Sequence, residues 1–184
     1  GPLLVMPADH HIKNFDVLTA KLPEAVKLAE QGKLVTFSIT PTEPHTGYGY
    51  IKQGAAIVGT GCYDVAQFKE KPDLDTANRY LAQGGYSWNS GMFLFTPAAY
   101  LKELERFAPK IATSVAAAAQ FTKDLGFTRP SNSALEHCPS DSIDYAILER
   151  SNNAVVMPVD LKWSDVGSFS SLDALTKKDE NGNS

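Results

Sequence analysis

The order of structural elements in residues 3–39 constrains the fold more than any other feature of the sequence. Leu3–Met6 is a short apolar run closed by a proline, which predicts a buried strand. Apolar residues then recur at helical spacing through Phe15–Ala29, and Gly32 provides a stop. Residues 34–39 predict a second strand. Because a strand, helix and strand in this order favour a right-handed crossover and a parallel sheet, we expect a doubly wound α/β fold.

The middle of the chain differs, because short apolar runs there are separated by glycine and proline. Such runs predict antiparallel or mixed strands inserted after the parallel part. The predicted strands span residues 48–52, 56–58, 65–71, 92–95 and 154–159. The predicted helices span residues 75–83, 97–107, 111–121, 143–148 and 168–175, and residues 130–139 are expected to form a loop.

Length and composition are typical of one soluble domain over residues 1–184. The net charge of -4 gives no attraction to nucleic acid or an anionic membrane. No apolar run nears the roughly 20 residues that span a bilayer. The two cysteines have no metal-like or redox-like spacing, which favours free thiols and a cytoplasmic location. Gly1-Pro2 resembles the remnant of a cleaved tag, and the polar residues 177–184 are expected to be frayed.

Two carboxylates stand where apolar runs give way to polar turns: Asp9 in Pro-Ala-Asp-His and Asp165 in Trp-Ser-Asp-Val-Gly. Ligands of α/β proteins bind beyond the carboxyl ends of such strands. Folding could therefore bring the two aspartates together to hold a divalent cation against a phosphate. Each also has a simpler explanation, since Asp9 could cap the following helix and Asp165 could cap a turn.

Two central segments combine glycine or proline residues, which interrupt regular secondary structure, with side chains suited to a phosphorylated sugar. In Thr-Gly-Tyr-Gly-Tyr-Ile at residues 46–51, the glycines could let backbone amides approach a ligand, and a hairpin or bulge is the alternative. In Phe-Lys-Glu-Lys-Pro at residues 68–72, Lys71 could neutralise a phosphate and Glu70 could accept hydrogen bonds from vicinal hydroxyls. Pro72 should break the strand and let both face one pocket, and the alternative is a solvated edge guarded by charge.

Two later segments carry polar side chains next to apolar ones. Trp-Asn-Ser-Gly-Met-Phe at residues 88–93 enters a predicted core strand, and the amide of Asn89 offers donors and an acceptor for sugar hydroxyls. The alternative is an Asn-Ser-Gly turn before that strand. In Ser-Ile-Asp-Tyr-Ala, Ser142 has the alternative role of a helix cap, and Asp144 that of an exposed helix face.

Taken in order along the chain, these segments closely resemble the bacterial mannose-1-phosphate guanylyltransferases, also called GDP-mannose pyrophosphorylases, from Leu3 to about Leu175. The resemblance implies a Rossmann-like nucleotidyltransferase fold of the glycosyltransferase-A type, with a mixed sheet flanked by helices. It also implies that the phosphate oxygen of mannose 1-phosphate attacks the α-phosphorus of GTP, giving GDP-mannose and pyrophosphate. No covalent enzyme intermediate is needed, so the protein supplies positioning and charge neutralisation.

The resemblance also implies roles for individual residues of this sequence. Asp9 and Asp165 match the aspartates that hold Mg2+, and Lys71 matches the lysine that meets the sugar phosphate, so these three are the expected catalytic residues. Asp144 is a weaker match that we expect to support the sugar pocket. The expected substrate-binding residues are Gly47, Tyr48, Gly49, Glu70, Lys71, Asn89, Gly91 and Asp144.

The sequence departs from the family at its beginning. Family members start with a strand and a glycine-rich loop whose Arg and Lys grip the triphosphate, whereas this sequence begins at the strand that ends in Asp9. We therefore expect an N-terminally truncated domain that is inactive by itself. The isomerase-type C-terminal domain of bifunctional relatives is also absent from the sequence.

Two other functions stay open at this stage. One is a non-catalytic module that binds phosphosugars or a partner, and the other is a sister sugar-1-phosphate nucleotidyltransferase that uses another base. A truncated sheet would also expose the apolar strands Leu3–Met6 and Leu34–Ile39. We therefore expect these edges to be covered either by a second copy, in a homo-oligomer that forms through exposed sheet edges, or by a rearrangement of the chain.

Overall fold

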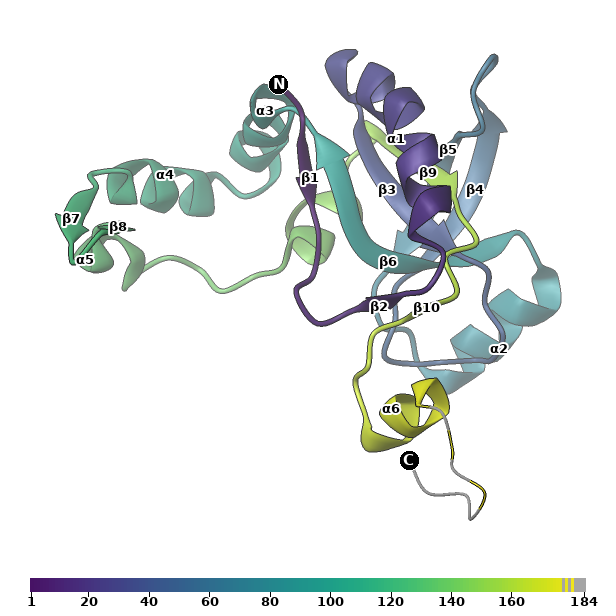
Figure 1. Ribbon diagram of the computed structural model, residues 1–184. Coiled ribbons are helices and arrows are strands. Elements are labelled where there is room, and N and C mark those ends of the chain that lie inside the picture. The colour runs from purple at the N-terminus through teal and green to yellow at the C-terminus, as the bar shows by residue number, and fades with distance from the viewer. Residues whose placement is uncertain (177, 179, 181–184) are drawn as a thin grey trace.

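A six-stranded mixed sheet forms the centre of the computed structural model, which describes residues 1–176, 178 and 180 (Figure 1). β3 and β9 run parallel, and the other neighbouring strands are antiparallel. The predicted mixed α/β sheet is therefore confirmed, whereas the expected fraying falls mostly on residues outside the described ones. The strand order is β1 (Leu3–Val5), β6 (Tyr86–Phe95), β3 (Leu34–Ile39), β9 (Ala154–Pro158), β5 (Tyr63–Lys69) and β4 (Tyr50–Ala56).

The predicted strand, helix and strand of residues 3–39 are present, but the two strands are not neighbours. α1 (Phe15–Glu30) connects β1 to β3. β6 lies between these strands and pairs antiparallel with both, so β1 and β3 run in the same direction without contact between their backbones. The sheet is therefore not purely parallel in this region, because a later antiparallel strand is inserted between the first two.

β6 closes the sheet on itself. One edge of β6 pairs with β3, while its other edge pairs with β4 at Tyr86–Trp88 and with β1 at Phe93–Phe95. Its ladder with β3 shifts register, and Gly91 at φ 71 lies at this irregularity. A glycine suits such a bulge because it adopts positive φ without a steric penalty. Within the described residues, β1 pairs along one edge only, and β5 has no ladder partner on its β9 side beyond Asp64.

The two apolar strands that were expected at exposed edges have different environments. β3 is paired on both sides and every one of its residues is buried, so Leu34–Ile39 is covered within the chain and needs no second copy. β1 is an edge strand, but the expectation of a buried strand at Leu3–Met6 is wrong, because Leu3 is 49% and Val5 42% exposed.

Helices cover both faces of the sheet and create two apolar cores. α1 and α2 (Leu74–Gln83) pack on one face, and α3 (Pro97–Phe107) and the π-helical turn Asp144–Leu148 pack on the other (Figure 1). Three residues of β3 (Val35, Phe37 and Ile39) enter the first core and Leu34 enters the second, so both faces of this strand are buried. The first core includes Leu18, Leu28, Phe37 and Tyr80, and the second includes Leu34, Phe93, Leu104, Ile147 and Val156.

The remaining elements are short, and several were not predicted. α4 (Pro109–Ala118) leads into an arm that extends from the sheet, with a hairpin of β7 (Thr122–Asp124) and β8 (Phe127–Arg129) (Figure 1). α5 (Asn132–Leu135) lies in the segment expected to be a loop, and α6 (Phe169–Leu175) agrees with the predicted last helix. No helix of the described residues is long and apolar enough to cross a membrane. Both cysteines are free, as expected.

Because Phe37 lies at the centre of the core, shortening its side chain should greatly lower the stability of the fold. Its side chain is fully buried, so Phe37→Ala should lower the free energy of unfolding by about 3–5 kcal/mol through lost burial and a cavity. Val58→Ala is the control, because Val58 is 97% exposed and its truncation should change stability by less than about 0.5 kcal/mol. Urea unfolding measures both, and equal effects would contradict the placement of β3 in the core.

Candidate functional site

A short antiparallel ladder joins two segments from opposite ends of the chain. β2 (His11–Ile12) pairs with β10 (Trp163–Ser164), and the two lie side by side in Figure 1. Nε1 of Trp163 also donates a hydrogen bond to Nδ1 of His10 over 3.1 Å. The segments that carry the two predicted metal aspartates therefore run next to each other.

A cavity of about 170 Å³ gathers most of the predicted site residues. Asp9 is exposed and is not part of its lining, whereas the neighbouring His10 is. Asp9 does not cap α1 either, because Asn14 holds that position. His10, Ser90 and Trp163 also line the cavity, and sequence reasoning missed them although they lie inside the quoted motifs. The predicted residues in the lining are Gly47, Tyr48, Gly49, Glu70, Lys71, Asn89, Gly91, Asp144 and Asp165.

The chain turns sharply after β5 and directs two charged residues into the cavity. β5 ends at Lys69, and Lys71 has φ 44, a left-handed conformation that is uncommon outside glycine. Glu70 and Lys71 consequently line the same cavity, with Nζ of Lys71 3.6 Å from Oε1 of Glu70. β5 pairs with β4 up to Lys69 but with β9 only at Tyr63 and Asp64, so the alternative of a strand edge guarded by charge stays open beside the cavity.

The carboxyl group of Glu70 is buried and only partly satisfied. Its Oε2 atom makes no hydrogen bond within the described part of the chain. Burial, followed by repulsion from Asp144, raises the pKa of Glu70 to about 7. Gly49 packs against this carboxyl so closely that a Cβ atom there would overlap Oε2. A buried polar atom without a partner needs an explanation, and a hydroxyl of a bound ligand would supply one.

Asn89 connects the sheet to the π-helical turn. Its Oδ1 accepts hydrogen bonds from Oγ1 of Thr36 at 3.1 Å and from the backbone N–H of Gly91 at 3.2 Å. Its Nδ2 donates to Oδ1 of Asp144 at 2.8 Å, which leaves one amide hydrogen for a ligand. Burial raises the pKa of Asp144. The alternative that Asp144 belongs to an exposed helix face is therefore wrong.

Asp165 is held by two hydrogen bonds to one carboxyl oxygen. Its Oδ1 accepts from the hydroxyl of Tyr48 at 2.9 Å and from the backbone N–H of Gly167 at 3.2 Å. The second bond confirms the turn-capping role of Asp165, which operates beside the first. Burial and the bond to Asp165 raise the pKa of Tyr48 far above its usual value, so the hydroxyl stays protonated and can donate.

The segment around Asp165 is conformationally strained. Lys162 has φ 48 and Val166 has φ 51. Positive φ is a genuine outlier for a β-branched residue such as valine, and outliers of this kind cluster at functional sites. The residues directly before and after the Trp163–Asp165 segment thus both have a left-handed backbone conformation.

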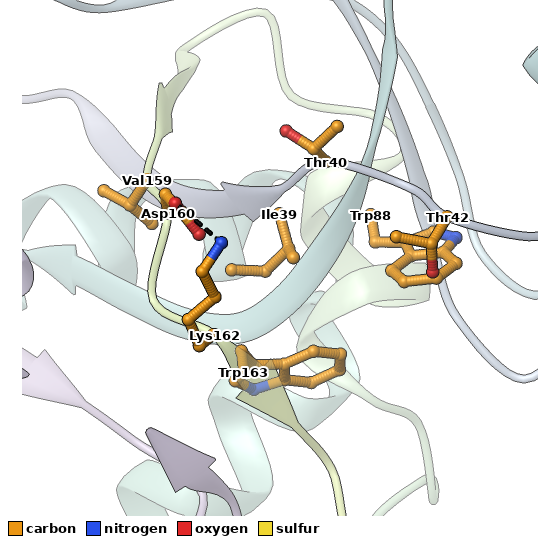
Figure 2. A pocket seen from close by; sticks show the side chains of 8 residues that line it. All are labelled: Ile39, Thr40, Thr42, Trp88, Val159, Asp160, Lys162 and Trp163. Carbon is orange, nitrogen blue, oxygen red and sulfur yellow. Dashed lines mark ion pairs between the residues drawn. The ribbon is translucent and has the colours of Figure 1, made fainter. Parts of the chain in front are cut away.

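A second hollow of about 520 Å³ lies beside the first and shares Trp163 with it (Figure 2). It contains none of the predicted residues. Its rim carries an ion pair in which Nζ of Lys162 is 3.0 Å from Oδ2 of Asp160, and both side chains are exposed (Figure 2). Because these charges neutralise each other, the smaller cavity is the better candidate for chemistry on a charged ligand, despite its size. The larger hollow is lined by Ile39, Thr40, Thr42, Trp88, Val159, Asp160, Lys162 and Trp163.

The raised pKa of Glu70 predicts a pH-dependent stability. Between its ordinary pKa of 4.5 and about 7, the unfolded chain loses the Glu70 proton while the folded chain keeps it, so stability should fall as the pH rises through this range. Glu70→Gln should remove this loss, so that the variant gains stability over the wild type from pH 5 to pH 8. Urea unfolding at several pH values measures the effect. Glu105→Gln, on the exposed side of α3, controls for the loss of one negative charge. If the free energy of unfolding of both variants depended on pH in the same way, the raised pKa of Glu70 would be contradicted.

Comparisons with known proteins agree with this architecture. The xanthan biosynthesis protein XanB of Xanthomonas campestris pv. campestris (strain B100) is 53% identical over 98% of this chain and 38% of its own length. A mannose-1-phosphate guanylyltransferase of Salmonella muenchen is 49% identical over 98% of this chain and 38% of its own length. The chain thus spans less than half the length of these curated relatives.

Solved structures share the fold. A Thermus thermophilus protein, described as a mannose-1-phosphate geranyltransferase, superposes with a TM-score of 0.81 and 30% identity, over 97% of this chain and 50% of that one. A mannose-6-phosphate isomerase of Helicobacter pylori gives a TM-score of 0.78 and 33% identity, over 89% of this chain and 63% of that one. The sequence profile of the nucleotidyl transferases matches residues 1–182. The chain therefore belongs to the nucleotidyl transferase family.

Proposed function

We propose that this chain carries the sugar-phosphate part of a mannose-1-phosphate guanylyltransferase, which converts GTP and mannose 1-phosphate into GDP-mannose and pyrophosphate. The observation that carries the proposal is the small cavity, where a lysine, a buried glutamate with an unpartnered oxygen and an aspartate share one lining. The relatives named for this activity support it.

The cavity offers separate groups for the two halves of a sugar phosphate. The ammonium group of Lys71 is exposed and can neutralise the phosphate as a point charge. Oε2 of Glu70 and the remaining amide hydrogen of Asn89 can bind sugar hydroxyls. In this proposal Gly47, Tyr48, Gly49 and Gly91 shape the wall, and Asp144 holds Asn89 in place.

We further propose that Asp9 and Asp165 hold a magnesium ion together with nucleotide phosphates. The described residues contain no cluster of three or more metal-ligating side chains, so a cage made by the protein alone is not present among them. This donor set suits Mg2+, which usually binds one or two carboxylates plus substrate phosphates. Oδ2 of Asp165 takes no part in the bonds to Tyr48 and Gly167, so it is the oxygen available to the ion. The ion would neutralise negative charge on the reacting phosphates.

The residues of the cavity fit an in-line displacement without a covalent intermediate. The attacking phosphate oxygen is already anionic, so the reaction needs no general base. The contribution of Glu70, Asn89 and Lys71 is therefore to orient the sugar phosphate and to offset its charge. The free thiols of Cys62 and Cys138 support a cytoplasmic location, and assembly through the open edge of β1 stays a prediction.

Binding of mannose 1-phosphate tests the sugar-phosphate site directly. Lys71→Ala should weaken binding about ten- to a hundredfold, because a charge-assisted contact to the phosphate is lost. Isothermal titration calorimetry measures the dissociation constant. Lys110→Ala is the matched control, since Lys110 is an exposed lysine on α4 outside the cavity lining.

Two outcomes would redirect the proposal. Equal affinities of the wild type, Lys71→Ala and Lys110→Ala would exclude the cavity as the phosphate site. Tighter binding of glucose 1-phosphate than of mannose 1-phosphate would favour a sister nucleotidyltransferase.

A further inference from the structure

The ring of Tyr48 is held by aromatic contacts on several sides. It stacks on His45, with ring centroids 3.9 Å apart and an interplanar angle of 15°. It also makes edge contacts with Trp88 at 5.0 Å and Trp163 at 5.2 Å. Both tryptophans line the larger hollow as well (Figure 2). Aromatic pairs at these separations are favourable, so the ring has little freedom to turn away.

The hydroxyl of Tyr48 bonds to one selected oxygen of Asp165. Its donation to Oδ1 over 2.9 Å combines with the bond from the Gly167 backbone to the same atom. Two donors on one oxygen restrict rotation of the carboxyl group. The other oxygen, Oδ2, is consequently presented in a defined direction.

The same cluster reaches the segment of the second aspartate. Trp163 contacts Tyr48 with its ring and donates from Nε1 to Nδ1 of His10, the residue that follows Asp9. The ladder between β2 and β10 contains only the pairs Ile12–Trp163 and His11–Ser164. Two-stranded pairings are marginal on their own, so the ring contacts contribute to keeping both segments together.

We propose that Tyr48 is a positioning residue for the metal site, and that its hydroxyl orients Asp165 so that Oδ2 is presented to the ion. This inference rests on the proposed function and gives Tyr48 a role beyond lining the sugar pocket. Groups that hydrogen-bond a metal-ligating side chain fix its orientation, and their loss typically weakens metal binding about 10- to 100-fold.

The variant Tyr48→Phe tests this role because it keeps the ring and removes only the hydroxyl. Tyr86→Phe is the matched control. The Tyr86 ring stacks on Tyr80 at 4.0 Å, and its hydroxyl donates to Oε1 of Gln67 at 2.9 Å, outside the cavity lining. Mn2+ binding in the presence of GDP-mannose, followed by electron paramagnetic resonance, is the main measurement. Mannose 1-phosphate affinity in EDTA and the thermal midpoint are measured in parallel.

Tyr48→Phe should weaken Mn2+ binding about tenfold or more, a larger loss than any in its mannose 1-phosphate affinity, while its thermal midpoint matches that of Tyr86→Phe. Unchanged Mn2+ binding would overturn the inference, and so would a parallel loss of metal affinity, sugar-phosphate affinity and thermal stability. A wild type that binds mannose 1-phosphate but no Mn2+ would overturn the inference alone. A wild type that binds no mannose 1-phosphate would instead overturn the proposed function.

Discussion

The pairing of β6 with three other strands is the interaction on which the rest of the structure depends. β6 joins β1 and β3, and through its first half it also pairs with β4. Its bulge at Gly91 sits where the ladder with β3 changes register. At this point the Asn89 backbone N–H donates to the carbonyl of Gly49, and its side chain bonds to Thr36 and Asp144. The irregular segment Asn89–Gly91 of β6 thus also lines the cavity.

Two different kinds of interaction organise the two sides of this cavity. On one side, Asn89 donates a hydrogen bond to Asp144, Glu70 is buried with one oxygen unpartnered, and burial raises the pKa of both acids. On the side of Asp165, aromatic side chains contact the Tyr48 ring, and its hydroxyl bonds to Oδ1 of Asp165, so that Oδ2 takes no part in the bonds to Tyr48 and Gly167. The first arrangement suits recognition of neutral sugar hydroxyls, and the second suits the presentation of a charged carboxylate to a cation.

Much of the local structure could be predicted because its causes are local. α3 begins at Pro97 behind the Thr96 side chain, which accepts from the N–H of Ala99, as the sequence pattern indicates. The bounds of β3 follow from its apolar run. The hairpin of β7 and β8 was missed, because its strands are exposed and carry no apolar alternation. The strand at Leu3–Val5 was judged buried from composition alone, and composition does not reveal whether a second layer covers a strand.

The sequence by itself determined which chemical groups are available and where β3 and α3 begin and end. It also placed Glu70, Lys71, Asn89 and Asp165 in segments suited to a sugar phosphate, because turn and strand signals act over a few residues. Only the tertiary structure decided that β6 lies between β1 and β3, that His10 and Trp163 share a hydrogen bond, and that Tyr48 contacts Asp165. These contacts join residues far apart in the chain, and they form because the closed sheet and its packed rings bring them together. No local propensity encodes them.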